Sequence, residues 1–165
     1  MSLLIADAGP LIALAKIEKL ELLKQLYGTV TIPQQVYSEL EIGSNRPGAK
    51  ALEQALLIGL LISVKTKYPP IAIISESVDA GEAEAITLAI EQKSDCPQLL
   101  IDDRKGRLVA KHHNIIVIGT AGILLIAKKQ GLLVQIKPVL EQLLNVGYRI
   151  SDPLCNKILQ LAGEV

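Results

Sequence analysis

Short apolar runs alternate along the chain with longer segments in which apolar residues recur every three or four positions. The runs predict strands, and the longer segments predict helices. The expected strands span residues 2–6, 29–32, 61–64, 99–101 and 115–118. The expected helices span residues 11–27, 33–41, 49–58, 80–92, 104–113, 121–130, 136–145 and 153–162. The segment 65–78, which contains Pro69-Pro70, is interpreted as a connector with extended pieces.

This alternation of strands and helices indicates an α/β fold with a central parallel sheet. Helices alone follow the last strand, so residues 121–163 are expected to form a helical C-terminal part. A length of 165 residues suits one domain, residues 1–165, with a core of its own. Half of the residues are apolar, but Trp and Phe are absent and Tyr occurs four times. The core must therefore be aliphatic, as in parallel sheets buried on both faces, and aromatic platforms for nucleic-acid bases are scarce.

Charge and cysteine content narrow the class of protein further. The 17 basic and 17 acidic residues cancel, so any contact with nucleic acid must come from a local patch. Cys96 and Cys155 lie far apart without a metal-binding spacing, which is typical of thiols in a reducing compartment. The N-terminal run reaches Asp7 without a charged segment before it, and no apolar run approaches the roughly 20 residues of a membrane span. We expect a cytoplasmic protein.

Acidic residues follow two of the expected strands. Asp7 comes directly after the first strand, and Asp102 and Asp103 follow the strand at 99–101. In open parallel sheets, ligands bind beyond the carboxyl ends of the strands. Asp7 also fits a helix cap or an Asx-turn before Pro10. One of the adjacent aspartates fits an N-cap, and the second is expected to be surplus to capping.

Two glutamates border apolar helix faces. Glu39 lies three residues beyond Val36, beside the face expected to be buried. At about 100° per residue, Glu82 falls on the apolar side of its helix, whereas Glu84 is expected to point to solvent. Each has a structural alternative, because Glu39 could extend outward and Glu82 could complete a capping box with Asp79.

These carboxylates are expected to converge at one edge of the sheet. Clustered carboxylates without Cys or His ligands favour hard, oxygen-binding ions, so the expected cofactor is Mg²⁺ or Mn²⁺. Such an ion activates water and stabilises the charge of an in-line phosphoryl displacement. The sequence therefore points to metal-dependent phosphoryl chemistry.

Four motifs occur in a characteristic order. They are Leu4-Ile5-Ala6-Asp7, Pro33-x-x-Val36-x-x-Glu39-Leu40, Gly81-Glu82-Ala83-Glu84-Ala85-Ile86 and Leu99-Leu100-Ile101-Asp102-Asp103-Arg104. This order and spacing, over nearly the whole chain, resemble the PIN-domain family. The last two motifs, with Gly119-Thr120-Ala121-Gly122-Ile123-Leu124 and the Gly163-Glu164 tail, look like a prokaryotic, toxin-like subgroup of PIN-like nucleases.

The resemblance implies a three-layer α/β/α sandwich and a Mg²⁺- or Mn²⁺-dependent endoribonuclease that cleaves single-stranded RNA. It also implies frequent homodimers and, often, the role of toxin in a toxin–antitoxin pair, with an antitoxin protein as partner. Asp7, Glu39 and Asp103 match the family's metal-binding acids, and Glu82 stands where many relatives have Asp. These four are the expected catalytic residues, and Asp102 joins them in the expected metal-binding set.

The expected contacts to substrate rest on basic and polar residues near the acids. Arg104 and Lys105 follow the acidic pair and could contact phosphates, although a solvated basic helix face is the commoner explanation. Arg107 and Lys111 belong to the same basic segment. Thr120 corresponds to a polar residue near the metal pocket of some relatives, or else is a helix cap or turn residue after Gly119.

Two other functions remain open on the sequence. A PIN-like scaffold with little catalysis could serve as a dimerising or partner-binding module, using its leucine-rich C-terminal helices. An aspartate-phosphorylating enzyme would also place an acid after the first strand. However, a phosphatase of the haloacid-dehalogenase type is expected to show Asp-x-Asp, and this chain has Asp7-Ala8-Gly9.

Overall fold

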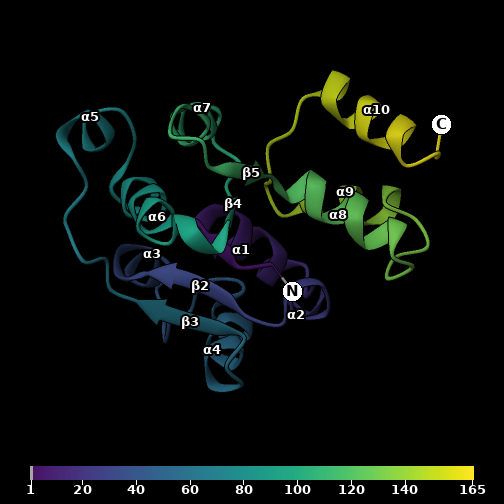
Figure 1. Ribbon diagram of the computed structural model, residues 1–165. Coiled ribbons are helices and arrows are strands. Elements are labelled where there is room, and N and C mark those ends of the chain that lie inside the picture. Colours follow the sequence, from purple (N-terminus) through teal and green to yellow (C-terminus); the bar gives the residue numbers. More distant parts are fainter. Residues whose placement is uncertain (1) are drawn as a thin grey trace.

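Five parallel strands form one sheet at the centre of the computed structural model, which describes residues 2–165 (Figure 1). The strands are β1 (Leu4–Ala6), β2 (Val30–Pro33), β3 (Leu61–Val64), β4 (Gln98–Leu100) and β5 (Ile116–Ile118). Their order across the sheet is β3-β2-β1-β4-β5, so the first strand of the chain is the central one. In the pairing register, Ile5 lies opposite Thr31 of β2 and opposite Leu99 of β4.

Helices cover both faces of this sheet. They are α1 (Ala8–Lys16), α2 (Glu21–Tyr27), α3 (Gln34–Glu39), α4 (Ala49–Leu57), α5 (Ala72–Ser75), α6 (Ala80–Glu91), α7 (Arg104–His112), α8 (Thr120–Lys129), α9 (Lys137–Asn145) and α10 (Asp152–Leu161). A short 3₁₀ turn, η1 (Lys93–Asp95), precedes β4. The fold is therefore an α/β/α sandwich around an all-parallel sheet, as expected from the sequence.

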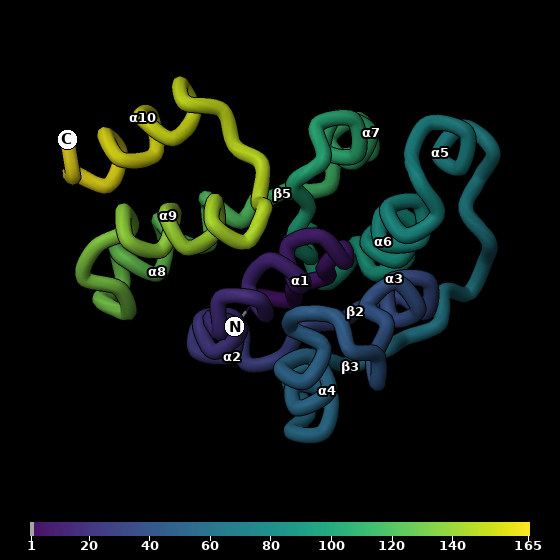
Figure 2. The backbone as a smooth tube through the Cα atoms, turned by 180° about the vertical axis from the view of Figure 1, so that it is seen from behind, coloured from purple at the N-terminus to yellow at the C-terminus, as the bar shows by residue number. Residues whose placement is uncertain are grey.

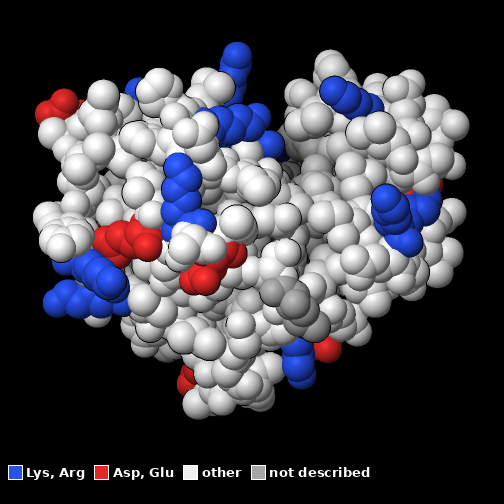
Figure 3. All heavy atoms as spheres, in the orientation of Figure 1, with Lys and Arg blue, Asp and Glu red and all other residues white. Residues whose placement is uncertain are grey.

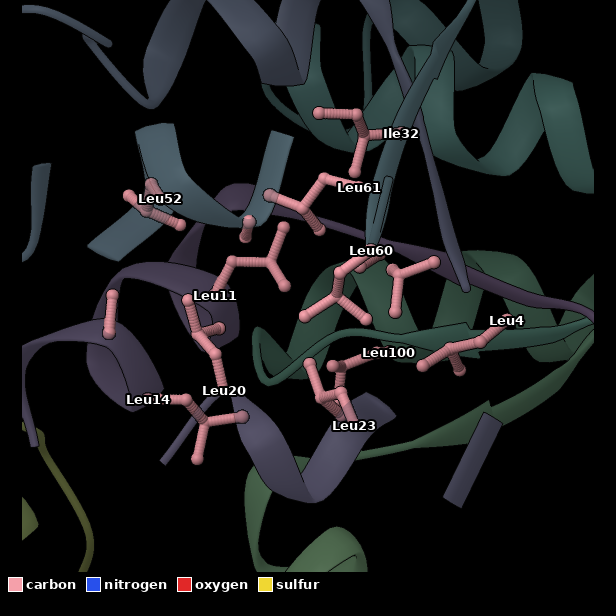
Figure 4. Close-up of a cluster of buried hydrophobic side chains, with 14 of the residues drawn as sticks. Leu4, Leu11, Leu14, Leu20, Leu23, Ile32, Leu52, Leu60, Leu61 and Leu100 are labelled. Atoms are coloured by element: carbon pink, nitrogen blue, oxygen red, sulfur yellow. The ribbon is translucent and has the colours of Figure 1, made fainter. Parts of the chain in front are cut away.

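The alternation of side chains along β1 separates two buried clusters. Leu4 and Ala6 pack with residues of α1, α2 and α4 on one face (Figure 4). Ile5 packs on the other face, with Leu99 and with the apolar residues of α6 and α7. Successive strand residues point to opposite faces, so a three-residue strand is enough to contribute to both layers.

The helical C-terminal part forms a third cluster. In Figures 1 and 2, α8, α9 and α10 lie together at the opposite end of the molecule from α5. Leu124, Leu140 and Leu143 are buried among them, together with Ala13 of α1 and Leu22 of α2. The C-terminal tail holds this cluster through Glu164, whose carboxylate accepts hydrogen bonds from Lys128 Nζ at 2.9 Å and from the backbone N–H of Ile136 at 2.7 Å.

Two of the expected elements are wrong. The expected helix at 11–27 is two helices, because Glu18 between them adopts a left-handed backbone with φ of 58°. The segment 65–78 contains the one-turn helix α5 rather than only extended pieces. The other expected elements occur within a few residues of their predicted bounds.

Within residues 2–165, no helix is both long and apolar enough to cross a membrane.

Candidate active site

The carboxyl ends of β1 and β4 mark the point where the chain's connections diverge. The helix after β1 packs on one face of the sheet, whereas the helix after β4 packs on the other. Such a switch point leaves a crevice in which open α/β sheets bind their ligands. Asp7 directly follows β1 here, and its backbone N–H donates to the carbonyl of Leu100 at 2.9 Å. Asp102 and Asp103 follow β4, so three carboxylates flank the crevice.

Asp7 occupies the N-cap position of α1, but its side chain makes no cap hydrogen bond. The carboxyl group is only 8 % exposed. Burial raises its pKa to about 7, and the negative charges of Asp79, Glu39 and Asp102 add to this rise, whereas a hydrogen bond from the N–H of Ala8 opposes it. A buried carboxylate among like charges, without a capping role, is held in a position that does not favour its ionised form.

Glu82 is the second buried acid, with a side chain 7 % exposed. The capping box that Glu82 could complete with Asp79 is present. Asp79 caps α6 by accepting from the N–H of Glu82 at 2.9 Å, as in a capping box. Burial nevertheless raises the pKa of Glu82 to about 8, and the charges of Asp79, Asp103 and Asp7 raise it further, against a hydrogen bond from the N–H of Asp79. Glu82 therefore takes part in capping α6, and it is also close enough to Asp7 and Asp103 for their charges to raise its pKa.

Glu39 approaches the same region from α3. Burial raises the pKa of its half-buried carboxyl group, and the charge of Asp79 contributes to the same direction. The helix α6 comes close at Gly81, where an added Cβ would lie 2.7 Å from Glu39 Oε1. Glycine at this position therefore leaves the space that the Glu39 carboxylate occupies.

Glu84 differs from the expectation of a solvated side chain. Its Oε1 accepts a hydrogen bond from the backbone N–H of Gln35 at 3.2 Å, at the start of α3. The prediction from helical phase was wrong because α3 packs beside α6. The backbone N–H of Gln35 therefore lies on the side of α6 that was expected to face solvent.

As expected, one of the two adjacent aspartates caps the following helix and the other, Asp102, does not, although Asp102 has a different structural partner. Asp103 caps α7, with Oδ2 accepting from the N–H of Gly106 at 2.8 Å. Asp102 accepts from both donors of Thr120, the backbone N–H at 2.8 Å and the hydroxyl at 2.7 Å. Asp102 therefore links the end of β4 to the first residue of α8.

Thr120 is fully buried and is not the N-cap, because Gly119 holds that position. Tyr148, in the loop between α9 and α10, lies against the same pair. Burial raises the pKa of its phenol, and the adjacent Asp102 carboxylate strengthens the effect. No sequence pattern predicts a role for Tyr148, because it comes from a distant loop without a motif.

Four basic residues of α7 follow Asp103; Lys111 is exposed, and only Arg107 turns inward. Arg107 donates from Nη1 to the carbonyl of Ile101 at 3.0 Å, and a Cβ added at Gly119 would lie 3.0 Å from the same nitrogen. Arg104 and Lys105, the expected substrate-binding residues, are exposed at the start of α7. Figure 3 shows Lys and Arg side chains scattered over a largely uncharged face, without a continuous basic surface.

A hollow of about 340 Å³ opens beside Asp102 and Asp103. Its other walls are α1 and the loop between α9 and α10. The lining residues are Gly9, Ile12, Ala13, Lys16, Val146, Gly147, Tyr148 and Arg149.

Comparison with known proteins decides the family. A protein-family model described as a PIN domain matches residues 3–164. The chain belongs to the PIN-domain family. No curated protein matches it closely enough to name a relative. PIN domains are typically nucleases and generally use divalent metal ions, so membership indicates a function of the nuclease type.

The acids of this PIN domain suit such an ion in their chemistry. All of them offer carboxylate oxygens, the ligands that Mg²⁺ and Mn²⁺ prefer. Residues 2–165 contain no three His, Cys, Asp or Glu side chains already arranged to hold a metal ion. In the same residues the ion pairs are Arg46–Glu41 and Lys128–Glu164, so no basic side chain neutralises Asp7 or Glu82.

Asp79 is the acid of this PIN domain that sequence reasoning left outside the site. The sequence predicts it only as a helix cap, yet its charge raises the pKa of Asp7, Glu39 and Glu82. Its position between three expected site residues follows from the packing of α3 against α6. The spacing Asp79-x-x-Glu82 was the available signal, since it fixes Asp79 one turn before a site residue.

Proposed function

We propose that this PIN domain is an endonuclease that uses Mg²⁺ or Mn²⁺ to hydrolyse single-stranded RNA. The observation that carries the proposal is Asp7, a buried carboxyl group with a pKa raised to about 7 and no capping role. A fold rarely keeps such a group without a function, because burying a charge among like charges is unfavourable. A bound cation would reverse that penalty.

Asp7, Glu39, Glu82 and Asp103 would hold the ion, which supplies activated water and stabilises the charge of the phosphoryl group during displacement. Asp7 and Glu82 must lose their protons to bind it, so binding would release protons near neutral pH. Glu39 borders the space beside Gly81, and Asp103 keeps one oxygen outside its cap hydrogen bond.

Asp102 acts more through its neighbours than as a direct ligand. Both of its oxygens accept hydrogen bonds from Thr120, which fixes the turn that carries Asp103. We therefore assign Asp102 and Thr120 to positioning the strand end. Arg104 and Lys105 remain candidates for phosphate contacts at the exposed start of α7.

The choice of single-stranded RNA rests on the family resemblance of the four motifs. The same resemblance supports action as the toxin of a toxin–antitoxin pair, with an antitoxin protein as partner, and a homodimer as the assembly. The proposed metal-dependent hydrolysis by the acids depends neither on the toxin role nor on the homodimer.

A cleavage assay on a set of labelled single-stranded RNAs with Mn²⁺ tests the proposal. Asp7→Asn and Asp103→Asn each remove one carboxylate, and asparagine keeps the ability of residue 103 to cap α7. We expect either change to lower cleavage by at least about 100-fold. Asp95→Asn, in the exposed turn η1, is the matched control and should cleave like the wild type.

A catalytically weak scaffold is the competing function. The observation in its favour is that no three potential ligands of residues 2–165 are pre-arranged around an ion. Failure of the wild-type protein to cleave any RNA in the set at saturating Mn²⁺ would support the scaffold. Cleavage lost in both site variants and kept in Asp95→Asn would exclude it.

A further inference from the structure

The hollow beside Asp102 and Asp103 joins parts of the chain that lie far apart in sequence. Gly9, Ile12, Ala13 and Lys16 of α1 form one wall. The loop of residues 146–149 forms the opposite wall, and the two aspartates close one end. The loop reverses direction at Gly147, whose φ of 94° lies in the left-handed region that favours glycine. The hollow therefore shares Asp102 and Asp103 with the candidate site.

The basic residues of this hollow come from both walls. Lys16 ends α1, and Arg149 lies in the opposite loop. Neither belongs to the ion pairs formed within residues 2–165. Lys16 is half-buried and Arg149 is exposed, so both positive charges are available to a ligand. In a chain with no net charge, two free cations beside a carboxylate cluster form a local site for anions.

We propose that this hollow holds the RNA strand next to the scissile bond, with Lys16 and Arg149 contacting backbone phosphates. The inference rests on the proposed function and adds the path of the substrate to it. Carboxylates repel a phosphodiester, and the two cations offset this repulsion on the side where the strand enters. Tyr148 lines the hollow and is the aromatic residue there, and base–aromatic stacking is a common contact in single-strand binding.

The size of the hollow fits a single strand. Its volume of about 340 Å³ lies at the low end of ligand pockets, which span about 300–1,000 Å³. Proteins that bind double-stranded RNA contact it over about 16 base pairs, which requires a far longer surface. A short stretch of unpaired strand is the form of nucleic acid that the hollow accommodates.

The test measures binding and cleavage of one probe, a 12-nucleotide RNA of mixed sequence labelled with fluorescein. Fluorescence anisotropy in EDTA at several salt concentrations gives the affinity without metal, and cleavage with Mn²⁺ gives kcat and KM. The variant is Lys16→Ala with Arg149→Ala. The matched control is Lys24→Ala with Lys157→Ala, which removes the same charge from exposed residues outside the hollow.

We expect the hollow variant to bind at least about tenfold more weakly and to raise KM with little change in kcat. Loss of two phosphate contacts should make the slope of log affinity against log salt about 1.4 less steep. The charge-preserving exchange Lys16→Arg with Arg149→Lys should restore most of the slope. The control variant should match the wild type in all of these measurements.

The outcomes separate the two proposals. A wild type that cleaves RNA, with a hollow variant equal to the control in affinity, KM and salt dependence, would overturn the hollow as the RNA path and leave the nuclease intact. The hollow would then serve another anionic ligand, such as an acidic partner peptide. A wild type that neither binds nor cleaves RNA would overturn the proposed function, and this inference would fall with it.

Discussion

Asp7, Asp79 and Asp103 all stand at the N-cap of a helix, but they use their side chains differently. Asp79 and Asp103 accept the cap hydrogen bond, at 2.9 Å and 2.8 Å. Asp7 does not, although a cap would stabilise α1 by about 1 kcal/mol. The difference identifies Asp7 as the acid whose position is least explained by the fold.

Replacing Asp7 tests this interpretation through stability. The pKa of Asp7 in the folded chain, about 7, lies above its ordinary value of 3.8. The destabilisation of the folded protein by the Asp7 charge is therefore absent below about pH 4. It grows as the pH rises and is complete above about pH 7. Asp7→Asn should raise the stability of the metal-free protein at pH 8 by on the order of 2 kcal/mol, and by almost nothing at pH 4. Thermal unfolding in EDTA at both pH values gives the comparison, and an equal gain at both would contradict the assigned cause.

A substitution at Gly81 tests whether the Glu39 carboxylate lies where the structure places it. A methyl group there would displace the Glu39 carboxylate, which sits at the end of a flexible side chain. Gly81→Ala should lower kcat/KM about 10–100-fold while leaving stability unchanged or higher by up to about 1 kcal/mol. In a Glu39→Ala background the same change should have little further effect, because the displaced group is gone. Additive losses of activity in the double variant would place the effect elsewhere.

At the scale of elements, the sequence predicted most of what depends on local pattern. The strand at 61–64 and the helix starting at residue 80 occur as expected, because their apolar period and turn residues are local signals. The break at Glu18 had no Gly or Pro to mark it, and beyond it α2 packs against the distant helix α8. The candidate site shows the same contrast between local and distant signals. The ends of two expected strands predict the positions of Asp7 and Asp103, whereas the position of Tyr148 and the inward turn of Arg107 depend on contacts with distant parts of the chain.

The C-terminal helices depend on one carboxylate. Burial raises the pKa of Glu164, but hydrogen bonds from the N–H of Ile136, from Lys128 and from the N–H of Lys137 outweigh it and lower the pKa to about 2. Because this value lies below the ordinary 4.5, the stabilisation is present above about pH 4.5 and is lost as the pH falls towards 2.

Glu164→Gln should therefore destabilise the protein at pH 7 by about 1 kcal/mol, or about 2–4 °C in Tm. The difference from the wild type should shrink between pH 4.5 and pH 2. Circular dichroism melts across this range measure it, with Glu141→Gln on the exposed side of α9 as the control. A difference that stays constant with pH would show that charge at residue 164 is not the cause.

At the scale of the whole molecule, acids from several elements are buried close together, and the repulsion between their charges destabilises the folded state. A bound cation would remove this destabilisation. An ion that binds only the folded state, at 100 times its Kd, stabilises it by about 2.7 kcal/mol. Mn²⁺ should therefore raise the Tm of the wild type by about 5–10 °C, and EDTA should reverse the rise. Asp7→Asn should lose most of this shift, whereas Glu164→Gln should keep it despite its lower starting Tm. Equal shifts in Asp7→Asn and the wild type would place the ion outside the crevice.

The central position of β1 affects how the protein is made. β1 leaves the ribosome long before its partner β4 is synthesised, because Ile5 pairs with Leu99. The crevice between them cannot close until β4 and α7 have emerged, and Thr120 anchors Asp102 only after that. A partly synthesised chain that has not yet reached Thr120 therefore lacks the assembled acids, so the candidate site forms only after the strand β4 and the start of α8 have been made.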